Sequence, residues 1–375
     1  MKRIFLSPPD VSGRERELVE EVFASNYVAP AGQMLGAFER AVARYTGIAS
    51  AVAVNSGTAA LHLALRHLGI GEGDEVWTSS MTFIGGASPI VFQRATPVFF
   101  DVCRTGWTID CDLVEEALAQ AAGGGVLPRA IVPTDLYGQS CDLDRLLALG
   151  LEYGIAIITD SAEALGARYK DRHAGKGAGA SILSFNGNKI ITTSGGGMLL
   201  SDDARLIEHA RFLSTQAREQ VPHYEHLEIG YNYRMSNVSA AIGLGQIEQI
   251  SQKIARRRQI FARYVEELSV IDGIDFMPEP SYATSTRWLS CVTLDPIRIR
   301  ARRDVIMRAC EEVDIEVRPL WKPMHLQPVF AGARFVGPGL CAELFEIGLC
   351  LPSGSGMTDE DQSRVIDVVI DVLKT

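Results

Sequence analysis

The feature that most constrains the fold of this chain is the alternation of short apolar runs with helical patterns over its first two-thirds. The apolar runs lie at 51–54, 75–78, 97–100, 130–133 and 155–159, with two more at 181–185 and 197–200. Helical patterns lie near 13–25, 35–46, 58–68, 112–121 and 143–152. Continuous apolar strands separated by helices are typical of a mostly parallel sheet with helices on both faces. The sequence therefore predicts an α/β fold.

The last third of the chain has a different pattern. Apolar residues recur at helical spacing through 237–269, which predicts one long helix. Residues 281–375 follow Pro278 and Pro280 as a smaller mixed unit that ends in a helix at 359–373. We expect a large α/β domain at 1–250, with its N-terminal segment, and a small C-terminal α+β domain at 251–375.

Charge and cysteine usage exclude several classes of protein. The formal net charge of −10 offers no basic surface to nucleic acid. The seven cysteines are scattered and show no CxxC spacing, so neither a disulfide framework nor a metal site is expected. No apolar run approaches the roughly 20 residues that span a bilayer. We expect a cytoplasmic protein that does not insert into membranes.

Lys189 lies in a polar, glycine-rich segment, SFNGNKIITTSGGG at 184–197. The plainer interpretation is a surface lysine beside a flexible hairpin. However, Ser184 could bind an anion, and three successive glycines allow the backbone to approach a ligand closely. A lysine in such a pocket can lose its proton and form a Schiff base.

Two further motifs follow strand ends. Asp160 comes directly after an apolar strand, where α/β sheets bind ligands, although it could equally be the N-cap of the next helix. The segment NSGT at 55–58 leads into a helix, and Gly57 and Thr58 could offer backbone N–H groups to a phosphate. Ordinary helix capping explains that segment as well.

The order of these three motifs is more informative than any one of them. Pyridoxal 5′-phosphate (PLP) needs a site for its phosphate, a carboxylate for its ring nitrogen and an amine for its aldehyde. The chain offers the phosphate site at 55–58, the carboxylate at Asp160 and the amine at Lys189. A single sheet could bring the three together.

At these residues the sequence resembles the DegT/DnrJ/EryC1/StrS family of sugar aminotransferases, which have PLP fold type I. The resemblance covers nearly the whole chain and includes the segments NSGTAAL, TFIGGASPI, LYGQ, DSAEALGA, SFNGNKIITT, GYNYRMSNVSAAIGLGQIE, RPLWKPMH and LPSG. Within the family the chain looks most similar to the PglE-type 4-aminotransferases of bacillosamine pathways. That subgroup shares Ser194 at the start of the glycine run, where many members have Gly-Glu-Gly-Gly.

The resemblance implies a role for each matching position. Lys189 would form the Schiff base, and Asp160 would face the pyridinium nitrogen. The cofactor phosphate would be bound by Gly57, Thr58 and Ser184, and by Asn232 of the partner chain. Phe83 would stack on the ring, and Glu163 would lie near the 3′-oxygen of the cofactor or the sugar. Weaker candidates for sugar-nucleotide contacts are Asn186, Arg234, Trp321 and His325, of which the last two could equally be packed core residues.

The implied activity is transfer of an amino group from L-glutamate to a nucleotide-linked keto sugar by a homodimer with shared active sites. The expected acceptor is UDP-2-acetamido-2,6-dideoxy-4-keto-hexose, which would become the UDP-4-amino sugar. One alternative is 3-amination of a dTDP-3-keto-deoxysugar. Another, from a different class, is a non-catalytic PLP-fold regulator, but such a protein would be expected to lack Lys189 or Asp160.

Overall fold

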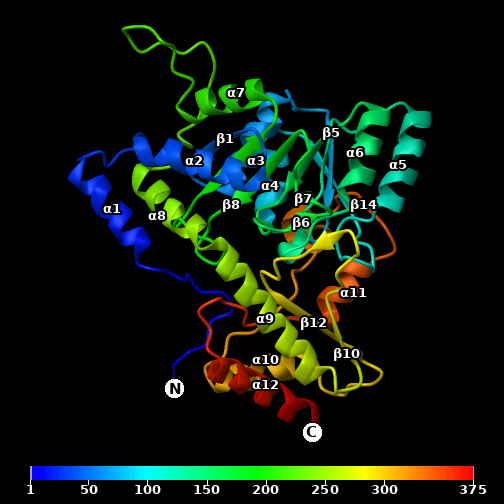
Figure 1. Cartoon of the computed structure of the whole chain (residues 1–375). Helices are drawn as coiled ribbons and strands as arrows, with labels where there is room; N and C mark the ends of the chain where they lie inside the picture. Colours follow the sequence, from blue (N-terminus) through cyan, green and yellow to red (C-terminus); the bar gives the residue numbers. More distant parts are fainter. Residues whose placement is uncertain (1, 375) are drawn as a thin grey trace.

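The computed structural model describes residues 2–374 and contains three sheets (Figure 1). The largest has eight strands, in the order β1 (Ser50–Val54), β9 (Gly197–Ser201), β8 (Ala180–Ser184), β5 (Ala156–Asp160), β4 (Ala130–Val132), β2 (Glu75–Ser79), β3 (Thr96–Phe100) and β14 (Phe335–Val336). Strand β9 is antiparallel to β1 and β8, and the remaining neighbours are parallel. The predicted mostly parallel α/β sheet is confirmed.

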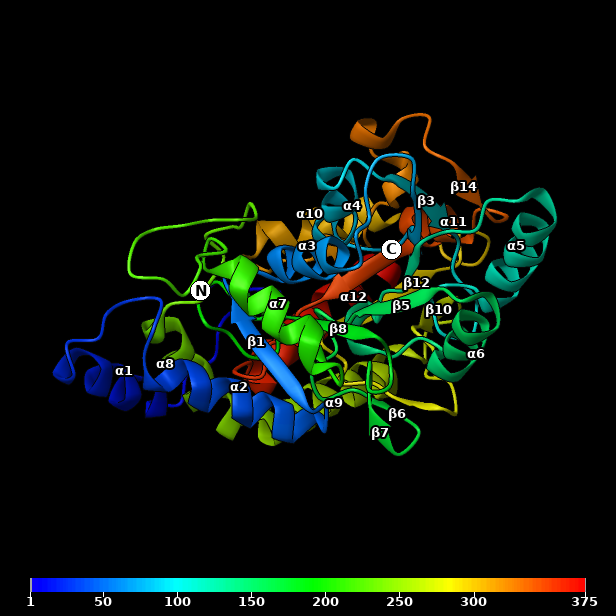
Figure 2. The same ribbon diagram turned by 90° about the horizontal axis from the view of Figure 1, so that it is seen from above.

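Helices cover both faces of this sheet because successive side chains of each strand point to opposite sides. Val52 and Val54 of β1 belong to the apolar cluster under one set of helices, whereas Ala51 and Ala53 belong to the cluster on the other side. The first face carries α3 (Gly57–His67), α4 (Ile84–Phe92) and α7 (Ala204–Ser214). The opposite face carries α2 (Gln33–Thr46), α5 (Cys111–Gly124) and α6 (Leu143–Tyr153), as Figure 2 shows from above.

The single long helix predicted over 237–269 is wrong, because the structure has two helices, α8 (Asn237–Glu248) and α9 (Ile250–Leu268). They separate at Gln249, whose backbone angles (φ −101°, ψ 0°) depart from the usual α-helical values of about −63° and −42°. The buried Gln246 side chain donates to the Asp10 carbonyl (2.7 Å) and to Glu15 (2.5 Å), which fixes the end of α8 against the N-terminal segment and α1 (Arg14–Ala24). Ile247 and Ile250 pack in the same cluster on either side of the break, so apolar spacing alone cannot reveal it.

The C-terminal third forms a four-stranded antiparallel sheet in the order β10 (Ile274–Phe276), β12 (Ser290–Leu294), β15 (Gly348–Leu351) and β13 (Arg318–Pro319). It is accompanied by α10 (Arg303–Glu312), α11 (Leu340–Ile347) and α12 (Asp359–Lys374). A third, small sheet contains β11 (Ala283–Thr284), β6 (Arg168–Tyr169) and β7 (Arg172–His173). The domain division at residue 250 stays a prediction. Among the contacts that cross it, β14 joins the large sheet and Ile4 bridges Ile315.

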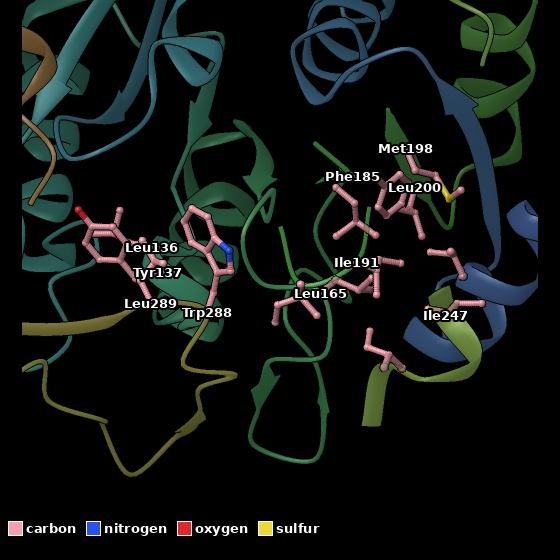
Figure 3. Packing of buried hydrophobic residues seen from close by; sticks show 14 of the residues in the cluster. Leu136, Tyr137, Leu165, Phe185, Ile191, Met198, Leu200, Ile247, Trp288 and Leu289 are labelled. Carbon is pink, nitrogen blue, oxygen red and sulfur yellow. The ribbon is translucent and has the colours of Figure 1, made fainter. Parts of the chain in front are cut away.

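The eight-stranded and four-stranded sheets meet around one apolar cluster, part of which is drawn in Figure 3. The fully buried Tyr137 comes from the large-sheet side, and Trp288 comes from the segment that leads into β12. Their rings stack with centroids 6.5 Å apart.

Over residues 2–374, no helix is both long enough and apolar enough to cross a bilayer. The same residues contain no group of three potential metal ligands.

Candidate active site

A cavity of about 410 Å³ opens where several strands of the large sheet end. Asp160 and Ser184 are the last residues of β5 and β8, and Gly57 follows β1 as the first residue of α3. Trp288, Arg318 and Trp321 line the cavity from the C-terminal third. The site therefore lies at the carboxyl ends of the strands, where open α/β sheets bind ligands.

The start of α3 forms one wall of the cavity. Ser56 is the N-cap, and its hydroxyl accepts the N–H of Ala59, which leaves the first helical N–H groups free to face an anion. The close approach of β9 depends on Gly197, because a Cβ there would lie 2.3 Å from the carbonyl carbon of Ser56 and 2.4 Å from the nitrogen of Gly57. This wall can receive a phosphate group.

Asp160 presents a buried carboxylate whose own hydrogen bonds are long. Ala162 N–H donates to one oxygen at 3.2 Å, and the Thr82 hydroxyl donates to the other at 3.4 Å. Burial raises the pKa of Asp160, while Ala162, Lys189 and Thr82 act in the opposite direction. A buried carboxylate with such weak partners has capacity for a cationic donor, which a protonated pyridine nitrogen would supply. No Cβ would fit at Gly86, where it would lie 2.6 Å from Asp160 Oδ2.

Lys189 points its Nζ at Glu163 Oε1, 3.1 Å away, and over the ring of Trp288 at 4.1 Å from the centroid. Burial raises the pKa of Glu163 to about 7, against the opposing effects of Lys189 and of the Tyr137 N–H. That N–H donates to Glu163 Oε2 at 2.7 Å. Tyr137 has a left-handed backbone (φ 53°, ψ 24°), so a strained turn presents this donor to the carboxylate.

A closed ring of hydrogen bonds holds the residue before Lys189. The Asn188 carbonyl accepts from the Ser7 hydroxyl and from Trp288 Nε1, both at 2.7 Å. The buried Arg257 completes the ring by donating to the Trp288 carbonyl (2.6 Å) and to Ser7 Oγ (3.1 Å). Three distant parts of the chain thereby fix the turn that carries Lys189.

The structure brings together nine of the twelve site residues expected from the sequence. The cavity is lined by Gly57, Thr58, Phe83, Asp160, Glu163, Ser184, Asn186, Lys189 and Trp321. The Phe83 ring is 60% exposed and lies 5.7 Å from the Trp321 ring, so one of its faces is available to a ligand.

The other three expected residues do not line this cavity within one chain. Arg234 is turned away, because its guanidinium donates to Glu39 (2.6 Å) and to the Ala53 carbonyl (2.9 Å). His325 stacks on Phe335 at 3.8 Å and bonds to Ser80 at 2.7 Å, which is the packed alternative. Asn232 is exposed on the surface, and its carbonyl accepts from Asn55 Nδ2 at 3.3 Å.

Comparisons with known proteins agree with this geometry. The family model described as the DegT/DnrJ/EryC1/StrS aminotransferase family matches residues 9–370. The chain belongs to this family. It is 47% identical to EpsN of Bacillus subtilis (strain 168), provisionally named a pyridoxal phosphate-dependent aminotransferase, over 100% of this chain and 97% of EpsN. It is 34% identical to the GDP-perosamine synthase of Caulobacter vibrioides, over 100% of this chain and 99% of that protein.

Among solved structures, the chain is similar to the PLP form of Spr1654 from Streptococcus pneumoniae, provisionally named a sugar aminotransferase. The TM-score is 0.90 at 26% identity, with 100% of this chain and 98–99% of the other covered across its PLP and apo forms. This member of the DegT/DnrJ/EryC1/StrS family is therefore a sugar aminotransferase, and PLP is its cofactor.

The aminotransferase also has cavity residues that sequence reasoning missed, among them Trp288, Glu316 and Arg318. Trp288 has no local signal, since its indole reaches a carbonyl 100 positions earlier in the chain. Glu316 and Arg318 did have a local signal in the sequence. Arg318 is the first residue of the RPLW segment quoted above, and Glu316 lies only two positions before it.

Proposed function

We propose that this protein transfers the amino group of L-glutamate to the C4 ketone of UDP-2-acetamido-2,6-dideoxy-4-keto-hexose, giving the UDP-4-amino sugar. The observation that carries the proposal is the convergence of Lys189, Asp160 and the start of α3 on one cavity. The similarity to the PglE type supports the choice of acceptor, and the similarity to GDP-perosamine synthases supports amination at C4.

The residues of the cavity would have separate roles in the reaction. Bound PLP supplies an aldehyde carbon that amines attack and a ring that takes up an electron pair. Gly57, Thr58 and Ser184 would bind the phosphate, and Phe83 would orient the ring by stacking. Asp160 would hold a proton on the ring nitrogen, which its buried and weakly bonded carboxylate favours.

Lys189 would bind the aldehyde carbon through Nζ and later move protons. Once the donor amine has displaced it, Nζ would take the proton from the α-carbon of glutamate, and in the second half-reaction it would return a proton to C4 of the sugar. Its side chain is 12% exposed and its Nζ lies against the ring of Trp288, so bulk water has little access to the amine. Glu163, 3.1 Å away, would set the charge of this amine between the two steps.

Asn186 and Trp321 remain proposed sugar contacts, since both line the cavity. We also propose a homodimer in which Asn232 of the partner subunit reaches the cofactor phosphate. The exposed position of Asn232 is compatible with such a role. A cytoplasmic location and a role in bacillosamine synthesis stay predictions from the sequence.

The proposal can be tested with L-glutamate labelled with nitrogen-15 and a panel of acceptors. The panel contains UDP-, GDP- and dTDP-linked 4-keto-6-deoxy sugars and a dTDP-3-keto sugar, and mass spectrometry reads transfer of the label. We expect labelled UDP-4-amino sugar from wild type and from Lys170→Ala, an exposed lysine outside the cavity, and none from Lys189→Ala. Preferred labelling of the 3-keto sugar would support the alternative, and no labelling of any acceptor would contradict the proposed reaction.

A further inference from the structure

The cavity contains very little positive charge for substrates that are strongly anionic. Among the described residues that line it, only Lys189 and Arg318 have cationic side chains, while Asp160, Glu163 and Glu316 are acidic. Lys189 is occupied by the cofactor chemistry described above. Within one chain, Arg318 is therefore the cation of the cavity that remains for a substrate.

Arg318 is held in a defined orientation at the rim of the cavity. It lies on β13, and its Nε and Nη2 both donate to Glu316 Oε1, at 3.0 and 2.7 Å. The other oxygen of Glu316 accepts the N–H of Leu6 at 3.1 Å. Burial alone would raise the pKa of Glu316, but these bonds outweigh it and lower that pKa. Glu316 is therefore ionised and fixed from two sides.

This arrangement leaves half of the guanidinium available. Within residues 2–374, Nη1 of Arg318 makes no hydrogen bond, and the side chain is 63% exposed. A guanidinium offers donors in a rigid planar fork that suits phosphate and carboxylate oxygens. Because Glu316 binds one edge of the guanidinium, the free edge can bind an oxyanion while Arg318 keeps its hydrogen bonds to Glu316.

We propose that Arg318 is a specificity-determining residue that binds the anionic group of the substrates, with Glu316 as its positioning residue. The inference rests on the proposed function, in which a nucleoside diphosphate sugar and a dicarboxylic amino acid occupy the same cavity in turn. Both carry negative oxygens away from their reacting atoms, so one rim arginine can serve the diphosphate, the carboxylate or both.

The test is calorimetric titration of the PLP-loaded protein with unreactive probes. UDP is compared with uridine, GDP with guanosine, and succinate with its diamide, so that each pair contrasts an anionic probe with an uncharged one. The variants are Arg318→Gln and Arg318→Lys. The matched control is Arg298→Gln, because Arg298 is 58% exposed, pairs with Asp272 at 2.9 Å and lies outside the cavity.

We expect Arg318→Gln to weaken binding of the charged probe about 10- to 100-fold while the uncharged partner is unaffected. Arg318→Lys should lose less, since it keeps the charge but not the fork. A loss confined to UDP and GDP assigns the diphosphate, a loss confined to succinate assigns the amino donor, and a loss of both assigns a shared role.

Equal affinities of wild type and Arg318→Gln for every charged probe would overturn the inference, as would an equal loss in Arg298→Gln. An equal loss of charged and uncharged probes would also overturn it, since that result indicates a structural role. These binding results do not depend on turnover. The inference can thus fail while the labelling experiment succeeds, or hold while that experiment fails.

Discussion

Glu163 is a carboxyl group with almost no access to water, beside the amine on which the chemistry depends. Its side chain is 2% exposed, and its burial raises the pKa from the ordinary 4.5 to about 7. A carboxyl group whose pKa is higher in the folded state contributes to folding stability in its protonated form, and this contribution is complete below pH 4.5. That contribution is lost as the pH rises through 7.

Replacement of Glu163 by glutamine should remove this pH dependence. We expect the free energy of unfolding of cofactor-free Glu163→Gln to rise relative to that of wild type by a few kcal/mol between about pH 4.5 and 7. Above that range the difference should stay constant. The measurement is thermal unfolding of both proteins from pH 5 to 8. Glu116→Gln, on an exposed face of α5, should follow the wild-type curve. Parallel curves for wild type and Glu163→Gln would show that Glu163 does not titrate in this range.

Single residues were predictable from the sequence where they follow a strand end in a polar segment. Asp160 and Lys189 meet that condition, and the structure places both on the cavity. Arg234 could not be excluded in this way, because its partner Glu39 lies 195 positions away, on α2. The ring through Ser7 and Arg257 is equally non-local, since its members meet only after the two sheets have packed together.

Secondary-structure elements were predicted best where the sequence of a buried strand is one continuous apolar run. Strands β1 to β5 and helices α1 to α3 match their expected ranges within a few residues. The short strands of the C-terminal third could not be located, because β11 and β13 have only two residues each and carry no periodicity. The break at Gln249 was missed since a buried polar contact, and not a change in apolar spacing, ends α8.

The turn between β1 and α3 depends on the glycine run of the neighbouring strand, which gives an element-scale prediction. A methyl group at Gly197 would enter the backbone of Ser56 and Gly57, whereas one at Gly195 would meet nothing within 4 Å. We expect Gly197→Ala to lose about 1–3 kcal/mol or more of stability and to bind PLP more weakly, because the phosphate wall must shift. Gly195→Ala should stay close to wild type.

Urea unfolding and PLP titration of the two alanine variants separate stability from cofactor affinity. If Gly197→Ala kept both values within error of Gly195→Ala, the close packing of β9 against this turn would be of no consequence. Loss of stability with unchanged PLP affinity would leave the packing argument intact but would remove the start of α3 from the phosphate site.

At the scale of the whole molecule, the segment between α7 and α8 projects from the body of the chain in Figure 1. It carries exposed apolar side chains, Tyr224, Leu227 and Ile229, each about four-fifths exposed. Large exposed apolar groups gathered on one segment indicate a contact with another protein surface. A second copy of the chain is the partner that the proposed function requires, and Asn232 lies at the end of this segment.

A shared active site makes subunit mixing the decisive experiment. Lys189→Ala removes the amine, and Asn232→Asp places a negative charge where the partner's cofactor phosphate would lie, so each variant alone should be nearly inactive at limiting PLP. In a mixed dimer of the two, one site carries both defects and the other carries neither. Equal mixing makes about half of the dimers mixed, each with one intact site, so about a quarter of wild-type activity should return.

If Asn232 acted within its own chain, every site of the mixed dimer would keep one defect and no activity would return. The same holds if the protein were a monomer, and light scattering distinguishes that case from an unshared dimer. Each variant incubated alone at the same total protein concentration provides the baseline, because exchange between identical subunits creates no intact site. Recovery above that baseline can arise only when intact Lys189 and intact Asn232 from different chains complete one site.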